Sequence, residues 1–510
     1  MLNAAANFIL GYSNLRLIGL RLYQPIILII TYAVIILLAY DKLFFGTATD
    51  LGYHWLLTNF ISEHKFVPTS YDPVLQVMSS YPPGSHIFAA LVGSVLGSNL
   101  LALHITALIS IIVVYTLIER ALQGENLLET FIALVLFVLG AIALRRSHIL
   151  IGNEIVYNFF YPQLFATGLC LVFLWITVSL TSRLPRLAFA LAGVSTLSYT
   201  YNLSAVVFAS AFVFINLCEV LTHKAPRNKL RSSLVLTGLC VLLVLMLVTP
   251  PTFRFMIINS AWNGDISVRF SPLTIALIAL ATVMTALWAG TFPEKLHLAS
   301  PSARFILAAS AGFAITALIQ YGAFLVLGMG SRYAVLKSAF GLGTFALCLS
   351  VMLIRNIVMR ASFISLSMLK RMKGIKMTLA RPIISLLFVC AVSASIFGYI
   401  TPVNFSAYSE YDRSIRDFVR RQTPTDIMNN TISVNSDYNV GLNFAVALAN
   451  LRLEHQIDQL RAFGYGEVPS PNPASYAFVA SSQTSTFDAA CKIASLGAAT
   501  LIWRTCWLKR

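Results

Sequence analysis

The sequence predicts a polytopic α-helical membrane protein that ends in a small α/β domain. Of its 510 residues, 57% are hydrophobic and only 11% are charged. Apolar runs long enough to cross a bilayer recur from residue 23 to residue 400. After Thr401 the composition changes, and charged segments alternate with short apolar runs. We therefore expect a transmembrane domain over residues 1–400 and a separate extracytoplasmic domain over residues 401–510.

The apolar runs predict about eleven transmembrane helices. The first is expected to be a retained anchor, because no small-x-small cleavage site follows it. The apolar segment 86–99 is short and interrupted by glycines, so it is expected to lie on the outer leaflet. The predicted spans are 23–41, 100–119, 127–144, 157–181, 184–199, 203–221, 232–249, 272–290, 303–327, 334–355 and 382–400.

The distribution of Lys and Arg predicts the orientation. Basic residues gather in alternate loops, most densely from Arg355 to Arg381, and such loops usually face the cytoplasm. The N-terminus is therefore expected inside the plasma (inner) membrane and the C-terminal domain outside, where Cys491 and Cys506 could form a disulfide. The net charge of +16 suits lipid headgroups, and no nucleic-acid recognition motif is present.

The C-terminal segment carries the pattern of a domain of about 100 residues, a size that can hold a core. Residues 409–426 predict an amphipathic helix with a charged face. Residues 431–437, 476–482 and 498–504 predict strands, and the stretch 487–497 between the last two predicts a helix.

Polar residues cluster in the first outer loop, about residues 42–99, which we expect to be the catalytic loop. Asp50 starts an apolar helical pattern that includes Tyr53 and His54. It either caps that helix or points into an outward cavity as a proton acceptor. The turn Tyr81-Pro82-Pro83-Gly84 then opens the next helix at His86, as a structural turn or as a wall of the pocket.

Two later outer segments add charge beside apolar spans. Arg145, Glu154 and Tyr157 lie in the second outer loop, between spans three and four, where Glu154 either pairs with Arg145 or Arg146 or has a functional role. Arg332, Tyr333 and Lys337 lie at the outer start of span ten, where the two cations could hold one anionic group or extend to lipid phosphate.

A divalent cation is possible but matches no metal-binding motif. The candidate ligands of the first loop are the side chains Asp50, His54, Glu63, His64, Asp72 and His86. No GxSxG, P-loop or dinucleotide-binding pattern occurs in the chain. No cofactor is therefore certain, and hydrolase, ATPase and nucleotide-sugar chemistry are disfavoured.

These motifs, in this order, resemble the GT-C superfamily of integral-membrane glycosyltransferases over roughly residues 23–400. The matching positions are Asp50 with Tyr53, the Tyr81-Pro82-Pro83-Gly84 turn, Glu154, and the group Arg332, Tyr333 and Lys337. The turn resembles that of poorly characterised bacterial members. The chain departs from the protein O-mannosyltransferases, because Leu51 follows Asp50 where they carry an Asp-Glu pair.

The resemblance implies an outward-facing enzyme that transfers a hexose or pentose from a polyprenyl-phosphate donor, with inversion, to a glycan, lipid or protein acceptor. Asp50 and Glu154 would be the catalytic pair. The substrate-binding residues would be Tyr53, His54, Tyr81, His86, Arg145, Tyr157, Arg332, Tyr333 and Lys337. The alternatives are a transporter or flippase of a lipid-linked or small anionic substrate, and a polysaccharide polymerase or ligase.

Overall fold

The computed structural model describes most of the transmembrane domain and parts of the C-terminal domain. The described residues are 50–68, 75–124, 127–222, 226–260, 266–292, 300–360, 388, 391–392, 396, 432–435, 476–480, 485, 487–496, 499–503 and 506. The predicted span 23–41, nearly all of span 382–400, Asp72 and the predicted helix 409–426 lie outside these residues.

Internal contacts divide the chain into two compact units. The first comprises Met1–Ile35, Ala107–Glu154 and Pro162–Tyr399, and the second comprises Ile36–Thr106, Ile155–Tyr161 and Ile400–Arg510. The helices of residues 99–360 are α5 (Asn99–Leu122), α6 (Leu127–Leu144), α7 (Asn153–Tyr157), α8 (Tyr161–Ser179), α9 (Arg183–Thr200), α10 (Asn202–Thr222), α11 (Pro226–Val248), α12 (Pro251–Ser260), α13 (Pro272–Thr291), α14 (Pro301–Leu325), α15 (Arg332–Lys337) and α16 (Ala339–Arg360).

Seven stretches of helix within the described residues are long and apolar enough to cross a membrane, so the chain is a multi-pass membrane protein. They are Leu101–Leu122, Leu128–Ser147, Tyr161–Ser179, Asn202–Thr222, Pro272–Thr291, Pro301–Leu325 and Arg332–Val358. Each overlaps a predicted span. The predicted spans 184–199 and 232–249 are also helical, as α9 and the apolar part of α11, but are shorter or more polar.

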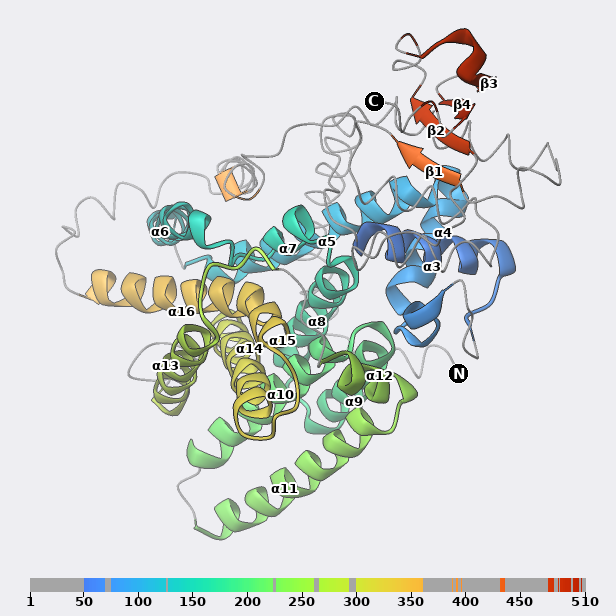
Figure 1. Ribbon diagram of the computed structural model, residues 1–510. Helices are drawn as coiled ribbons and strands as arrows, with labels where there is room; N and C mark the ends of the chain where they lie inside the picture. Colours follow the sequence, from blue (N-terminus) through green and yellow to red (C-terminus); the bar gives the residue numbers. More distant parts are fainter. Residues whose placement is uncertain are drawn as a thin grey trace. The chain divides into compact units, whose positions relative to one another are not determined.

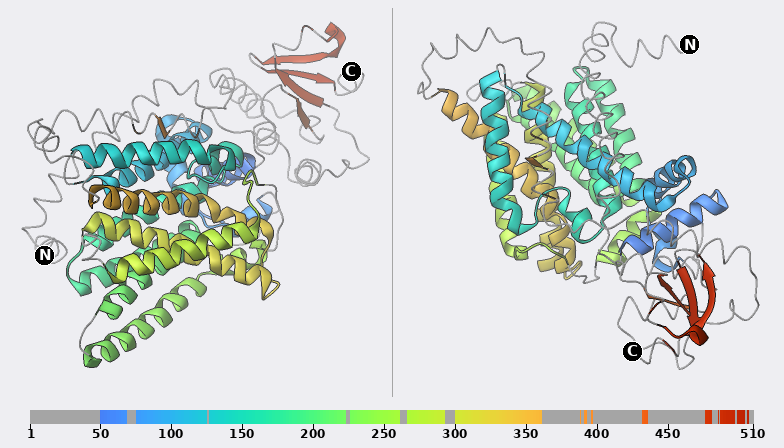
Figure 2. Two further views of the ribbon diagram at one scale, coloured as in Figure 1. Left: turned by 90° about the vertical axis from the view of Figure 1, so that its left-hand side faces the viewer. Right: turned by 90° about the horizontal axis from the view of Figure 1, so that it is seen from above.

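The first unit is a helical bundle in which α14 packs against α10, α13 and α16 (Figures 1 and 2). Gly312 allows α14 to approach α10 closely, because a Cβ there would lie 2.6 Å from the carbonyl oxygen of Val207. The Ser310 hydroxyl donates a hydrogen bond to the Phe345 carbonyl on α16 at 2.9 Å. In a bilayer the hydrophobic effect does not drive helices together, because the lipid tails are as apolar as the side chains. Close packing at small residues and hydrogen bonds between helices stabilise the bundle instead.

The second unit holds the described residues of the segment that is predicted to be the first outer loop. It contains α3 (Asp50–His64), a 3₁₀ turn η2 (Gln76–Ser80) and α4 (Gly84–Leu96), and α3 packs on both other elements. Leu57 of α3, Leu75 and Met78 belong to a common buried cluster with Tyr53 and Tyr81 against its edge. The predicted helix at 86–99 is therefore present, and it ends at Gly97, whose φ of 71° is the left-handed conformation that favours glycine.

The described C-terminal residues form a four-stranded sheet of order β1-β2-β4-β3, with β1 parallel to β2 and the other pairs antiparallel. The strands are β1 (Ile432–Asn435), β2 (Tyr476–Ala480), β3 (Lys492–Leu496) and β4 (Ala499–Trp503), and Figure 2 shows them side by side. The strands predicted within 431–437, 476–482 and 498–504 are all present.

The helix predicted over 487–497 is wrong. A 3₁₀ turn η5 (Ala489–Cys491) leads into β3, which forms an antiparallel hairpin with β4. Pairing with a neighbouring strand decides the structure of a segment this short, and local helical preference does not. Cys491 and Cys506 form a disulfide.

Candidate active site

Glu154 occupies the start of the short helix α7, in a tight loop after α6. The Asn153 side chain accepts a hydrogen bond from the Leu150 amide at 3.1 Å, and the Glu154 carboxyl accepts one from the Gly152 amide at 2.6 Å. Gly152 has a φ of 106°, which a residue with a side chain would adopt only with strain. This backbone turns the Glu154 side chain inward, where it is 1% exposed.

Burial controls the protonation of Glu154. It raises the pKa of the carboxyl to about 8, against an opposing contribution from the Gly152 amide hydrogen bond. The ion pair that sequence reasoning offered as an alternative, with Arg145 or Arg146, does not form within the described part of the chain. Near neutral pH the side chain therefore holds its proton in most molecules and can both donate and accept hydrogen bonds.

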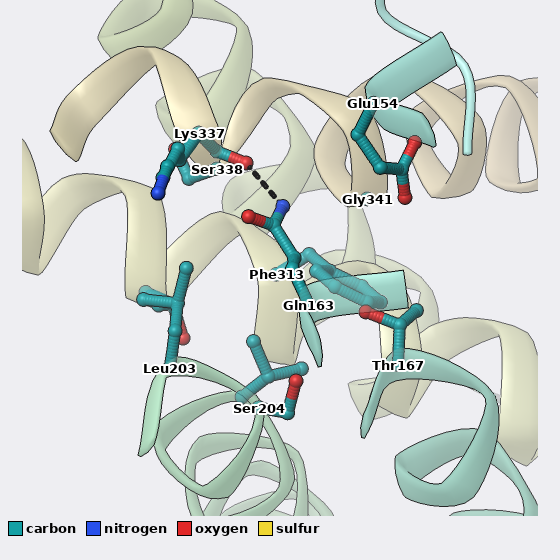
Figure 3. A pocket seen from close by; sticks show the side chains of 11 residues that line it. Glu154, Gln163, Thr167, Leu203, Ser204, Phe313, Lys337, Ser338 and Gly341 are labelled. Atoms are coloured by element: carbon teal, nitrogen blue, oxygen red, sulfur yellow. Dashed lines mark hydrogen bonds between the residues drawn. The ribbon is translucent and has the colours of Figure 1, made fainter. Parts of the chain in front are cut away.

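Glu154 and Lys337, both predicted site residues, line one cavity in the first unit although they are far apart in the sequence (Figure 3). Gln163 of α8 lies between them, and its amide donates a hydrogen bond to the Lys337 carbonyl at 2.8 Å. The free volume is about 10 Å³, close to the room that one water molecule needs. The lining residues are Glu154, Gln163, Thr167, Leu203, Ser204, Val207, Phe313, Thr316, Lys337, Ser338 and Gly341.

The basic helix α15 forms one wall of this cavity. The Ser331 hydroxyl caps the helix by accepting a hydrogen bond from the Ala334 amide at 3.2 Å. The Lys337 ammonium lies 4.4 Å from the centre of the Tyr333 ring, a cation–π contact that keeps these two side chains together. Arg332 is exposed at the start of the same helix and is not among the lining residues.

Arg145 stands at the start of a 3₁₀ turn, η3 (Arg145–Ser147), that follows α6. The segment before α13 contacts this turn, since the Arg269 amide donates a hydrogen bond to the Ser147 carbonyl at 3.3 Å. Burial, together with the Arg269 charge, lowers the pKa of the nearby His148. The structure thus joins two basic segments that the sequence separates. The backbone of Tyr157 ends α7, and its side chain lies outside the described residues.

The remaining predicted residues lie in the second unit. Asp50 is the first described residue of α3 and is half-buried, as are Tyr53 and Tyr81. His54 and His86 are buried and meet at 3.1 Å between His54 Nδ1 and His86 Nε2. Burial lowers the pKa of His86 to about 3, so its ring is neutral at physiological pH.

Tyr161 completes this histidine cluster by donating a hydrogen bond from its hydroxyl to the Ser85 carbonyl at 2.7 Å. The rings of His54 and Tyr81 also meet edge to face, with centroids 5.6 Å apart. The histidine cluster therefore fixes the Tyr81-Pro82-Pro83-Gly84 turn to α3. Among the described residues no group of three His, Cys, Asp or Glu side chains is placed to hold a metal ion.

Sequence reasoning missed Gln163, Thr167 and Ser204 of the Glu154 cavity. The available signal was a polar residue within an otherwise apolar span, where its amide or hydroxyl needs a partner inside the bundle. These three residues were not predicted because the search for site residues followed charged and aromatic side chains, and these three are uncharged.

Comparison with known proteins gives structural likenesses only. No protein-family model matches the chain, and no curated protein matches it. ArnT from Cupriavidus metallidurans in the apo state is 12% identical, with a TM-score of 0.45 over 95% of this chain and 98% of that chain. The same protein bound to undecaprenyl phosphate is 10% identical, with a TM-score of 0.46 over 94% of this chain and 97% of that chain.

The Archaeoglobus fulgidus oligosaccharyltransferase, in complex with Zn and sulfate, is a further structure of this kind. It is 13% identical, with a TM-score of 0.36 over 89% of this chain and 68% of that chain. Likeness at this level assigns no role to any residue.

Proposed function

We propose that the chain is a GT-C-type glycosyltransferase that moves a hexose or pentose from a polyprenyl phosphate to a cell-envelope glycan, lipid or protein on the outer face of the plasma membrane. The observation that carries the proposal is that Glu154 and Lys337 line one cavity of a multi-pass membrane protein. The order of Asp50, the Tyr81-Pro82-Pro83-Gly84 turn, Glu154 and the basic helix α15 supports it.

The reaction needs a base for the acceptor and a cation for the leaving group. The acceptor oxygen attacks the anomeric carbon and gives its proton to a carboxylate, while the bond to the donor phosphate breaks and its electron pair leaves with the phosphate. Attack from the opposite face inverts the anomeric carbon. In this proposal Lys337 and Arg332 stabilise the negative charge of the departing polyprenyl phosphate.

The two carboxyl groups suit different tasks. Because burial raises the pKa of Glu154 to about 8, its protonated form can hold a sugar hydroxyl through a hydrogen bond and is a poor base near pH 7. Asp50 is only half-buried at the start of α3. We therefore assign the base to Asp50 and the positioning of a sugar to Glu154. The further substrate-binding residues of this proposal, as the resemblance implies them, are Tyr53, His54, Tyr81, His86, Arg145, Tyr157 and Tyr333.

The test is sugar transfer by the purified full chain in lipid vesicles, offered a panel of polyprenyl-phosphate sugars. Wild type is compared with Asp50→Asn, which keeps the size of the side chain and removes the base. We expect donor turnover by wild type and a loss of about 100-fold or more in the variant.

Glu63→Gln is the matched control, because Glu63 is exposed near the other end of the same helix α3 and the change removes the same charge. It should keep wild-type turnover. If wild type consumes no donor from the panel, or if Asp50→Asn and Glu63→Gln behave alike, the assignment of Asp50 is wrong. Movement of intact donor across the vesicle bilayer without transfer would favour a flippase.

A further inference from the structure

A second, open cavity of about 330 Å³ lies in the first unit, at the opposite end of the helices that form the Glu154 cavity. Its lining includes Arg183 and Arg186 of α9, Glu219 of α10 and Arg304 of α14. Three guanidinium groups and one carboxylate leave this cavity with a net positive charge.

The two cavities lie toward opposite faces of the bilayer. Along α10, Ser204 lines the first and Glu219 the second, about 22 Å apart at the helical rise per residue. Along α8, Gln163 and the adjoining Leu180 are about 25 Å apart by the same rise. Since the apolar part of a bilayer is roughly 30 Å thick, the second cavity opens near the headgroups of the other leaflet.

One arginine in the cavity is already paired. Arg186 donates two hydrogen bonds to the Glu219 carboxylate, at 2.7 and 3.0 Å, and its side chain is 10% exposed. This bidentate pair neutralises the one carboxylate and holds both side chains in place. The repulsion that Glu219 would exert on an anion is thereby cancelled.

The other two arginines remain exposed and face the cavity. Arg183 and Arg304 each stand in the first turn or close to the first turn of a helix, and neither forms an ion pair within the described residues. The Ser300 hydroxyl fixes the start of α14 by accepting a hydrogen bond from the Ala303 amide at 3.2 Å. The N-termini of α9 and α14 add a partial positive charge to the two guanidinium groups.

We propose that this cavity binds a phosphate group, on the membrane face opposite the Glu154 cavity. Arg183 and Arg304 hold the phosphate oxygens, and the pair of Arg186 and Glu219 forms the rigid floor. Guanidinium groups match phosphate geometry, and an open cavity near the headgroups admits either an anionic lipid or a soluble phosphate. This site is separate from the proposed transfer reaction.

The test compares the full chain with the double variant Arg183→Gln and Arg304→Gln. In phosphatidylcholine nanodiscs containing phosphatidylglycerol, native mass spectrometry measures the retained anionic lipid. In nanodiscs of phosphatidylcholine alone, calorimetric titration measures the binding of inorganic phosphate. We expect the double variant to bind at least one of these probes about tenfold or more weakly than wild type.

The matched control is the double variant Arg146→Gln and Arg254→Gln, which removes two exposed arginines that do not line this cavity. It should bind both probes as wild type does. Loss in the lipid arm identifies a lipid headgroup as the ligand, and loss in the phosphate arm alone identifies a soluble phosphate. The proposal is overturned if wild type binds neither probe, or if both double variants, folded as judged by their melting temperatures, bind them equally.

Discussion

At the scale of single residues, the most consequential feature is the buried carboxyl of Glu154, in the short helix α7 between α6 and α8. Glu154 was predicted from its position beside an apolar span, where an acid is costly unless it has a purpose. Its burial and its lack of an ion pair within the described residues could not be predicted, because they depend on the turn at Gly152 and on packing against α15 and α16. The order of residues along the chain does not predict that Gln163 and Lys337 line the same cavity as Glu154.

The burial of Glu154 predicts a pH dependence of stability. The folded pKa of about 8 exceeds the ordinary value of 4.5, so between these limits the folded protein holds a proton that the unfolded chain has lost. Stability should therefore fall as pH rises from about 5 to 8. Glu154→Gln cannot ionise, so its stability should lack this fall. We expect the melting temperature of the variant minus that of wild type to be a few degrees larger at pH 8 than at pH 5.

The measurement is the melting temperature of purified protein in detergent across this pH range. Glu63→Gln serves as the control, since Glu63 is exposed. Parallel curves for wild type and Glu154→Gln would contradict the burial of an ionisable carboxyl.

At the scale of elements, the long helices were predictable and the short ones were not. A transmembrane span must satisfy its backbone internally over about 20 residues, so an apolar run of that length predicts a helix. The ten-residue helix α12 and the strand β3 carry no such constraint. Their structure follows from what they pack against, which is why the helix predicted over 487–497 proved to be a strand.

The crossing of α14 over α10 predicts different outcomes for two glycines of one helix. A Cβ at Gly312 would lie 2.6 Å from the Val207 carbonyl oxygen and 2.9 Å from the Ala211 Cβ, whereas a Cβ at Gly322 meets nothing within 4 Å. Gly312→Ala should destabilise the protein by about 1–3 kcal/mol, because backbone must move. Gly322→Ala should be neutral or slightly stabilising.

This prediction is tested by measuring the melting temperatures of the two variants and of wild type in the same detergent. Equal melting temperatures for Gly312→Ala and Gly322→Ala would mean that α10 and α14 do not approach this closely.

At the scale of the whole molecule, the disulfide bears on orientation. The basic loops predict that the C-terminal domain is extracytoplasmic, and the bond between Cys491 and Cys506 is the kind that persists only in an oxidising compartment. We expect a membrane-impermeant maleimide to label both cysteines in intact cells, and only after treatment with an impermeant reductant.

Cys491→Ser combined with Cys506→Ser provides the background. Among the described residues Cys170, Cys218, Cys240 and Cys348 lie in apolar helices, and Cys390 falls in the predicted span 382–400. Labelling that requires permeabilised cells would reverse the orientation, and with it the faces assigned to both cavities.

The small size of the Glu154 cavity has a consequence for affinity. A free volume of about 10 Å³ cannot admit a sugar ring, so a sugar-bearing ligand would enter only a wider conformation of this cavity. Loss of the hydrogen bond between Gln163 and the Lys337 carbonyl would be one way for α15 to move and widen it. The apparent dissociation constant then equals the intrinsic one divided by the fraction of molecules that are open, and a population of about 1% weakens binding roughly 100-fold. A substitution that loosens α15 could therefore tighten binding without touching the ligand, and measured affinities would report the opening equilibrium of the bundle as much as the fit of the sugar.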